Sequence, residues 1–150
     1  MKVAALIPAR SGSVRVKDKN IRLLGNYPLL GRKIKQLQSS RVDEIFLGSN
    51  DPGYLDIAKQ FGATPVYRSE RACDESVSTA NDMIADFTAR VPDEFDIVVW
   101  AHCTNPFLYA RQYDAAIDVF EKNSGTHDSV LSVQKIQNHM WANEESPINY

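Results

Sequence analysis

Residues 6–21 read LIPARSGSVRVKDKNI and overlap an apolar run, Val3 to Ile7, that is typical of a buried β-strand. The stretch contains the small residues Ser11, Gly12 and Ser13 and, with the residue that follows it, the cations Arg10, Arg15, Lys17, Lys19 and Arg22. Small residues let backbone N–H groups turn inward around an anion, and arginine and lysine add charge-assisted hydrogen bonds to phosphate oxygens. Because α/β folds bind ligands at the carboxyl ends of their strands, the stretch predicts a nucleoside triphosphate at the mouth of a parallel sheet.

Two common phosphate-binding motifs are absent from this stretch. No Gly-Lys-Ser or Gly-Lys-Thr follows at the spacing of a Walker A loop, and the dinucleotide motif Gly-x-Gly-x-x-Gly does not occur. From the residues alone, a solvated basic loop is therefore the alternative to a phosphate site.

The same stretch resembles the N-terminal signature of the cytidylyltransferases that activate acidic sugars, the acylneuraminate (CMP-sialic acid synthetase) family. In that signature, Ile-Pro-Ala-Arg precedes a Gly-Ser turn, a basic residue and then Lys-Asn-Ile. This chain carries, in the same register, Ile7 to Arg10, Gly12-Ser13, Arg15 and Lys19 to Ile21. The Lys-Asn-Ile ending favours the acylneuraminate branch over the related 3-deoxy-octulosonate-type enzymes.

The resemblance implies a reaction and a set of site residues. A sugar hydroxyl attacks the α-phosphorus of CTP and pyrophosphate leaves, while the protein positions the reactants and neutralises charge. The backbone of Leu6, Pro8 and Ala9 would border the pyrimidine, and Arg10 and Lys19 would be the catalytic cations. The other nucleotide-binding residues that the resemblance implies are Gly12, Ser13, Arg15, Asn20, Arg68 and Arg71.

The resemblance also implies Mg²⁺ as cofactor. Residues 1–150 offer no convincing pair of carboxylates, so the metal ligands stay unassigned.

The segment from Arg68 to Ser76 resembles the family's Arg-Pro…Ala-x-Asp segment, which lies over the base and the sugar of the nucleotide. Ser69 replaces the proline, and the spacing from Arg68 to Asp74 is one residue short. Either Arg68 or Arg71 could therefore contact the base, and Arg68 is preferred because it directly follows a short strand pattern.

Polar motifs also follow two other expected strands. Ser49-Asn50-Asp51 resembles a Ser-Thr-Asp of the family, although these residues could equally cap the next helix.

The segment from His102 to Leu108 stands where the family has Gln-x-Thr-Ser-Pro-Leu-Arg. His102 replaces the glutamine and Thr104 agrees, so the resemblance implies that both bind the sugar. Leu108 replaces an arginine that would grip a carboxylate, so the identity of the sugar acid is left open, with Arg111 as another source of positive charge.

Short apolar segments alternate with helical patterns along the chain. This alternation predicts an α/β fold with a mostly parallel sheet and helices on both faces, and the resemblance implies the three-layer Rossmann-like nucleotidyltransferase form. The segment from Phe95 to Ala101 is apolar enough to be a central strand covered on both faces. The other expected strands are Val3–Ile7, Glu44–Gly48, Thr64–Tyr67 and Ser129–Val133, and the expected helices are Leu29–Ser39, Tyr54–Phe61, Ser78–Val91 and Arg111–Lys122.

Composition limits the classes of partner. The chain has 150 residues and a net charge of −2, which argues against a general nucleic-acid binder and suits one small anionic ligand held by a local basic loop. Its two cysteines, Cys73 and Cys103, form no metal or disulfide pattern and fit a reducing cytoplasm. No signal peptide and no apolar run of about 18 residues is evident, so no membrane partner is expected.

The C-terminal segment from Asn138 to Tyr150 is polar, irregular and without a closing element. Members of the resembled family run well beyond this point. We therefore expect residues 1–150 to be a nucleotidyltransferase domain that lacks the C-terminal part of the family fold, and the full-length protein to be a homodimer. A non-catalytic nucleotide-binding module and a 3-deoxy-octulosonate-type cytidylyltransferase are the alternatives.

Overall fold

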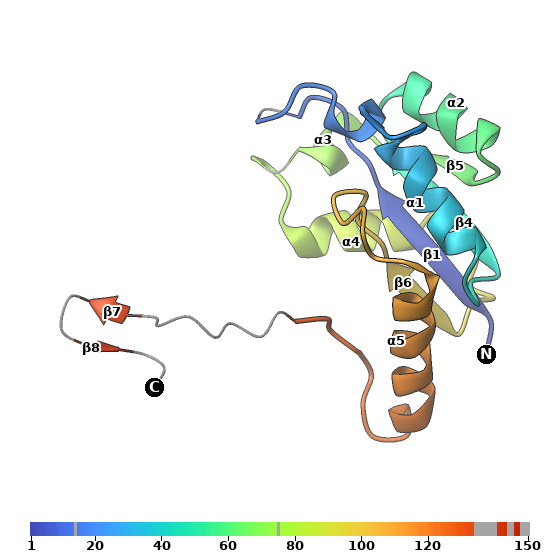
Figure 1. Ribbon diagram of the computed structural model, residues 1–150, viewed down its shortest axis with the longest axis vertical. Helices are drawn as coiled ribbons and strands as arrows, with labels where there is room; N and C mark the ends of the chain where they lie inside the picture. Colours follow the sequence, from blue (N-terminus) through green and yellow to red (C-terminus); the bar gives the residue numbers. More distant parts are fainter. Residues whose placement is uncertain (14, 75, 134–140, 144–145, 148–150) are drawn as a thin grey trace. The chain divides into compact units, whose positions relative to one another are not determined.

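Four short parallel strands form the central sheet of the computed structural model (Figure 1). The structure describes residues 1–13, 15–74, 76–133, 141–143 and 146–147. The strands are β1 (Val3–Pro8), β4 (Glu44–Ser49), β5 (Thr64–Tyr67) and β6 (Ile97–Trp100), in the order β5-β4-β1-β6. Leu6 of β1 pairs with Phe46 on one side and Trp100 on the other, so β1 lies inside the sheet.

Side chains of the strands alternate between two packed faces. Ala5 and Ile7 belong to one buried cluster with Leu30, Ile34 and other residues of the helices α1 and α2, and Tyr113 of α5 joins it. Ala4 and Leu6 point to the other face, where they meet Phe87 of α4. The sheet therefore lies between helices on both of its faces, which confirms the expected three-layer α/β fold. The helices are α1 (Leu29–Gln38), α2 (Pro52–Gln60), α4 (Ala80–Thr88) and α5 (Ala110–Asn123).

Local capping fixes where two of these helices begin. The Asp51 carboxylate accepts hydrogen bonds from the N–H groups of Gly53 and Tyr54 at the start of α2. The helix-capping alternative for Ser49-Asn50-Asp51 is thereby confirmed. Thr79 and Asp82 form a reciprocal capping box at the start of α4.

Several short elements complete the described chain. A 3-10 turn, η1 (Lys19–Ile21), precedes the antiparallel pair β2 (Leu23–Leu24) and β3 (Tyr27–Pro28), and the short helix α3 (Glu70–Cys73) follows β5. Near the C-terminus, β7 (Trp141–Asn143) pairs with β8 (Ser146–Pro147), so part of the segment expected to be irregular is a small hairpin. The rest of Asn138–Tyr150 lies outside the described residues.

The strand expected at Phe95–Ala101 is present as β6, but its expected central position is wrong for the sheet that the structure describes. Observed β6 is shorter and pairs with β1 alone among the strands that the structure describes. The expected cover on both faces is confirmed and accounts for the apolar character of β6, because Val99 packs against the cluster on one face and Trp100 against the cluster on the other. Val98, by contrast, is 47% exposed.

Two other expectations about elements also need correction. Ser129–Val133 is not a strand, and Val130, Leu131 and Val133 are exposed. The helix expected over Ser78–Val91 is shorter, because Thr79 caps its start and regular structure ends at Thr88.

The chain divides into two compact units, Met1–Ile117 and Asp118–Tyr150. The sheet and every residue of the candidate site described below belong to the first unit. Within the described ranges, no helix has the length and apolarity needed to cross a membrane.

Candidate functional site

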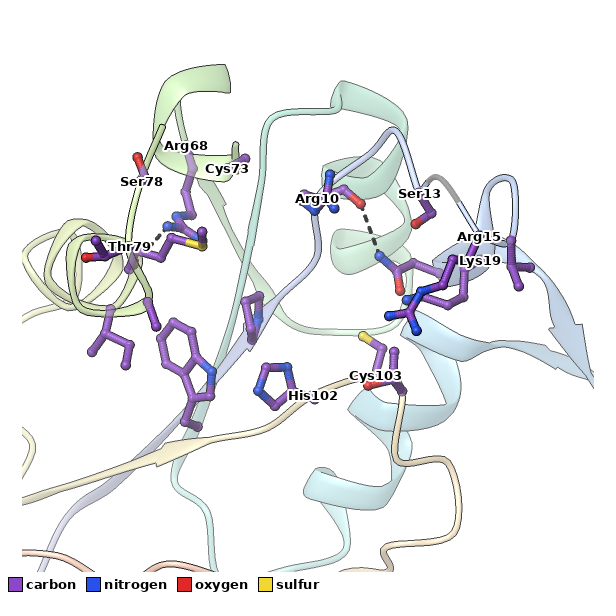
Figure 2. Close-up of a pocket in the computed structure, with 18 residues that line it drawn as sticks. Arg10, Ser13, Arg15, Lys19, Arg68, Cys73, Ser78, Thr79, His102 and Cys103 are labelled. Atoms are coloured by element: carbon purple, nitrogen blue, oxygen red, sulfur yellow. Dashed lines mark hydrogen bonds between the residues drawn. The ribbon is translucent and has the colours of Figure 1, made fainter. Parts of the chain in front are cut away.

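A pocket of about 1080 Å³ opens at the carboxyl ends of the strands. Figure 2 shows Arg15 and Lys19 on one side, Arg68, Ser78 and Thr79 on the opposite side, and His102 between them. The lining comes from the loop after β1, the segment around α3, the first turns of α4 and the residues that follow β6. The lining residues are Pro8, Arg10, Ser13, Arg15, Val16, Lys19, Asn20, Arg68, Cys73, Ser78, Thr79, Ala80, Met83, Ile84, Trp100, His102, Cys103 and Thr104.

The loop after β1 is held by hydrogen bonds to its neighbours. The Ala9 N–H donates to the Gly48 carbonyl at 2.9 Å, and the Ser11 N–H donates to the Asn50 side-chain oxygen at 3.1 Å. Gly12 has φ +74°, a left-handed conformation that glycine adopts without strain. The loop thereby brings Arg10, Ser13, Arg15 and Lys19 to the pocket, as expected for phosphate-binding residues.

Asn20 supports this loop from inside. Its side chain is 6% exposed, and its Nδ2 donates to the Arg10 carbonyl at 3.1 Å (Figure 2). Asn20 therefore fixes the backbone of Arg10 while it lines the pocket, and a contact between Asn20 and the nucleotide stays a prediction.

Some predicted nucleotide-binding residues lie behind the pocket wall. Leu6 is fully buried in the core, and its carbonyl accepts a hydrogen bond from the Ala101 N–H at 2.8 Å. Ala9 is also buried, and of the three residues expected to border the base only Pro8 lines the pocket. Gly12 shapes the loop without lining the pocket.

The structure separates the two candidate arginines after β5. Arg71 is exposed and lies outside the pocket lining, whereas Arg68 is 3% exposed and lines the pocket. The Arg68 Nε donates to Asp86 at 2.9 Å, and its Nη2 donates to the carbonyls of Ala72 at 3.1 Å and Met83 at 2.8 Å. Its guanidinium also lies 5.1 Å from the centroid of the Phe87 ring. Arg68 thus links α3 to α4 at the wall of the pocket.

Asp86 holds two arginines at this wall. Hydrogen bonds from Arg90 and then from Arg68 outweigh burial and hold the pKa of Asp86 below its usual value. The carboxylate therefore stays charged at neutral pH and keeps Arg68 in place.

The residues that follow β6 form the 101–109 loop, from Ala101 to Tyr109. The His102 ring stands edge-on to Trp100, with ring centroids 6.3 Å apart. Burial first, and then the charges of Lys19 and Lys33, lower the pKa of His102, so the imidazole is neutral at pH 7. Cys103 is buried, and burial raises the pKa of its thiol to about 12. Neutral His102 can therefore donate or accept a hydrogen bond in the pocket, while Cys103 stays protonated.

Leu108 is the part of this loop that contacts the core. It is half-buried and packs against the cluster formed by α1, α2 and the sheet. Arg111, proposed as another source of charge, is exposed on α5 and does not line the pocket.

Two features of the site were not predicted from the sequence. One is the apolar wall formed by Met83, Ile84 and Trp100. The other is Lys33, a fully buried lysine of α1 whose Nζ contacts the 101–109 loop. A signal for Lys33 was present, because it falls on the same helical stripe as Leu30 and Ile34.

With this geometry in hand, comparison with known proteins identifies the family. A family model described as "Cytidylyltransferase" matches residues 4–146. The chain belongs to this cytidylyltransferase family. The resemblance found from the residues of the first loop is thereby confirmed.

Curated relatives of this cytidylyltransferase chain include enzymes for several sugar acids. It is 36% identical over 141 residues to the CMP-N,N'-diacetyllegionaminic acid synthase of Legionella pneumophila, a match that covers 91% of this chain and 59% of that protein. It is 31% identical over 140 residues to the N-acylneuraminate cytidylyltransferase of Oncorhynchus mykiss, covering 93% of this chain and 32% of that protein. The chain thus spans between about a third and three fifths of the length of these relatives.

Solved structures share the fold. The CMP:2-keto-3-deoxy-manno-octonic acid synthetase complexed with CTP superposes with a TM-score of 0.70 at 18% identity, covering 83% of this chain and 49% of that one. A cytidylyltransferase from Leptospira borgpetersenii gives a TM-score of 0.64 at 25% identity, covering 83% and 51%. The nucleotidyltransferase type of the three-layer fold is therefore confirmed.

The magnesium expected from the family resemblance does not find ligands in the described lining of the cytidylyltransferase pocket. No aspartate or glutamate lines it, and no group of three or more His, Cys, Asp or Glu side chains suited to a metal occurs within the part of the chain that the structure describes. Magnesium prefers carboxylate and water oxygens, so the arginine- and lysine-rich lining does not fit the ion. We therefore assign no residue as a ligand of magnesium and no step of the reaction to the ion.

Proposed function

We propose that this chain binds CTP and transfers its CMP group to an acidic keto sugar, with release of pyrophosphate. One observation carries the proposal: in a chain of the cytidylyltransferase family, Arg10, Ser13, Arg15 and Lys19 converge on a single pocket that His102 and Thr104 also line. The first group suits a triphosphate and the second suits a sugar hydroxyl.

The reaction needs positioning and charge neutralisation more than covalent help. The sugar hydroxyl oxygen forms a bond to the α-phosphorus, the bridging bond to the β-phosphate breaks, and the hydroxyl proton passes to water. Negative charge then grows on the departing pyrophosphate. Arg10 and Lys19, which both line the pocket, would stabilise that charge by preorganised electrostatic contacts.

An acidic keto sugar is the acceptor that the relatives support. The relatives named above are synthases or cytidylyltransferases of legionaminic, neuraminic and keto-deoxy-octonic acids. Leu108 packs against the core in place of the arginine expected there, so the proposal assigns the carboxylate of the sugar no partner in the 101–109 loop. The pocket also has an apolar wall at Met83 and Ile84, which suits a substrate with apolar substituents.

Two further features belong to the proposal. The resemblance implies a homodimer, which light scattering on the purified protein would test. Cys73 and Cys103 are both free thiols, which supports a reducing compartment such as the cytoplasm.

Calorimetric titration with CTP, UTP, ATP and GTP, followed by a pyrophosphate-release assay with CTP and a panel of keto sugar acids, tests the proposal. Tightest binding of CTP and acid-dependent release of pyrophosphate are the expected results. Binding of CTP without release with any acid would favour the nucleotide-binding module. Equal or tighter binding of ATP would contradict the assignment of CTP.

Substitution of His102 tests the sugar side of the pocket. The His102→Ala variant should raise the KM for the sugar acid about tenfold, as expected for the loss of a hydrogen bond to substrate, while the KM for CTP changes little. Steady-state kinetics with each substrate varied in turn would measure both constants. A rise in the KM for CTP larger than the rise in the KM for the sugar acid would show that His102 contacts the nucleotide instead.

A further inference from the structure

Lys33 is a buried cation whose hydrogen bonds all leave its own helix. Its side chain has no exposed surface. The ammonium lies 2.9 Å from the Asn105 carbonyl, 2.8 Å from the Tyr113 hydroxyl and 3.5 Å from the Leu108 carbonyl. Because a buried charge is costly unless it is paired, a lysine in the middle of an apolar stripe calls for an explanation.

Two neighbours on α1 contact the same loop. The Arg32 Nε donates to the Pro106 carbonyl at 3.1 Å, and the Gln36 Nε2 donates to the same carbonyl at 2.7 Å. Two hydrogen bonds within the loop, from the Asn105 N–H to the His102 carbonyl and from the Leu108 N–H to the Asn105 carbonyl, are 3.3 Å long. They are longer than the bonds from Arg32, Gln36 and Lys33 to the carbonyls of Pro106 and Asn105, although the Lys33 contact to Leu108 is 3.5 Å. The conformation of the 101–109 loop therefore depends on side chains of α1.

The same loop presents His102 and Thr104 to the pocket. We propose that Lys33 is a positioning residue, whose ammonium holds the 101–109 loop through the Asn105 and Leu108 carbonyls and so keeps a positive charge beside the loop that carries His102. The effect on the imidazole is independent of the reaction, and only its consequence for turnover rests on the proposed function.

The electrostatics agree with this role. Burial, Lys19 and Lys33 all lower the pKa of His102. Burial, and to a lesser extent Arg32, lowers the pKa of Lys33 itself to about 8, while Cys103 opposes this. Tyr113, the other titratable group against Lys33, has a pKa raised to about 12 by burial and stays a neutral hydroxyl. At pH 7 the ammonium is therefore charged and the imidazole beyond it is neutral.

Nuclear magnetic resonance titration of the histidine rings in the full chain tests the first part of the proposal. The Lys33→Met variant removes the charge and keeps the length of the side chain, so the midpoint of the His102 titration should move to higher pH. Lys35→Met is the matched control, because Lys35 lies on the same helix but is exposed and lies over the Tyr27 ring. It should leave that midpoint unchanged. A wild-type midpoint in folded Lys33→Met would overturn the proposal.

A second variant covers the case in which Lys33→Met fails to fold. Tyr113→Phe removes one acceptor of the ammonium and leaves the two carbonyls in place. This variant should lower the pKa of Lys33, which a titration of the lysine side-chain resonances would measure. It should also broaden or shift the backbone resonances of the 101–109 loop. Unchanged Lys33 and loop resonances would contradict the positioning role.

Kinetics then separate this proposal from the proposed function. Both Lys33→Met and Tyr113→Phe should raise the KM for the sugar acid about tenfold, which corresponds to about 1.4 kcal/mol, and leave the affinity for CTP within twofold. Equal losses for both substrates would count against the proposal. If the wild-type chain shows no turnover, the proposed function fails, and the resonance measurements still decide the role of Lys33.

Discussion

At the scale of single residues, the basic side chains of the first loop carry the largest consequences for ligand binding. Arg10→Ala and Lys19→Ala should each weaken CTP binding by about 1.5–3 kcal/mol, because each removes a charge-assisted contact. Neither side chain belongs to the apolar core, so the melting temperature should hardly change. Calorimetric titration with CTP measures the loss.

Lys17 provides the control for this pair. It lies on the same loop, is exposed and does not line the pocket. Lys17→Ala should therefore bind CTP nearly as well as the wild type. A loss equal to that of Lys19→Ala would mean that only the overall charge of the loop matters.

Leu108 tests whether its position serves the substrate or the core. Because its side chain packs against the core cluster, Leu108→Arg should destabilise the fold by about 2 kcal/mol or more through burial of an unpaired charge. The same substitution at Phe107, which is 68% exposed, should cost little. Thermal unfolding of the two variants gives the comparison. A stable Leu108→Arg variant with improved turnover of a sugar acid would show that the side chain at position 108 contacts the substrate.

At the scale of elements, Gly48 allows β4 to approach the side chains of Arg68 and Phe87 closely. A methyl group at this position would lie 2.7 Å from the Arg68 Cδ and 2.7 Å from the Phe87 ring. Gly48→Ala should therefore push α4 and Arg68 away from the sheet and cost about 1–3 kcal/mol of stability. Chemical denaturation measures the loss, and the CTP titration shows whether the pocket is affected as well.

Gly125 is the matched glycine. A methyl group there would meet no atom within 4 Å, and its φ is not in the left-handed region. Gly125→Ala should leave stability nearly unchanged. Similar losses at both positions would show that crowding beside Arg68 is not the cause.

At the scale of the whole molecule, the buried Lys33 links global stability to pH. Its pKa is about 8 in the folded chain and 10.5 as the ordinary value, so between these values the unfolded chain binds more protons at this group. Stability from this group therefore rises as pH increases from about 8 to 10.5, by up to about 3 kcal/mol. Below pH 8 the full cost of burying the charge applies.

Denaturant unfolding of the wild type and Lys33→Met across pH 7–11 checks this dependence. The difference in free energy of unfolding between the two proteins should move in favour of the wild type as pH rises, because only the wild type carries the Lys33 ammonium, whose pKa of about 8 in the folded chain lies below its ordinary value of 10.5. A difference that is constant with pH would show that Lys33 has its ordinary pKa in the folded chain.

The amino-acid sequence by itself determined the layered fold of this protein and the loop that brings most of the basic side chains to the pocket. Alternation of apolar runs with helical stripes is a local pattern, and it was enough to predict the four strands of the sheet and the helices on its faces. The first loop is also local, because consecutive residues bring Arg10, Ser13, Arg15 and Lys19 to one pocket.

Only the tertiary structure decided which residues act together across the chain. The apolar run at β6 reflects packing on both faces and says nothing of its place at the edge of the described sheet. Arg68 and Arg71 look alike in sequence, but only Arg68 meets Asp86 and faces the pocket. Lys33 and the 101–109 loop are about 70 residues apart, a pairing that no local pattern encodes. Such contacts depend on how helices pack on the sheet, which is set by the sum of many buried surfaces and not by any single motif.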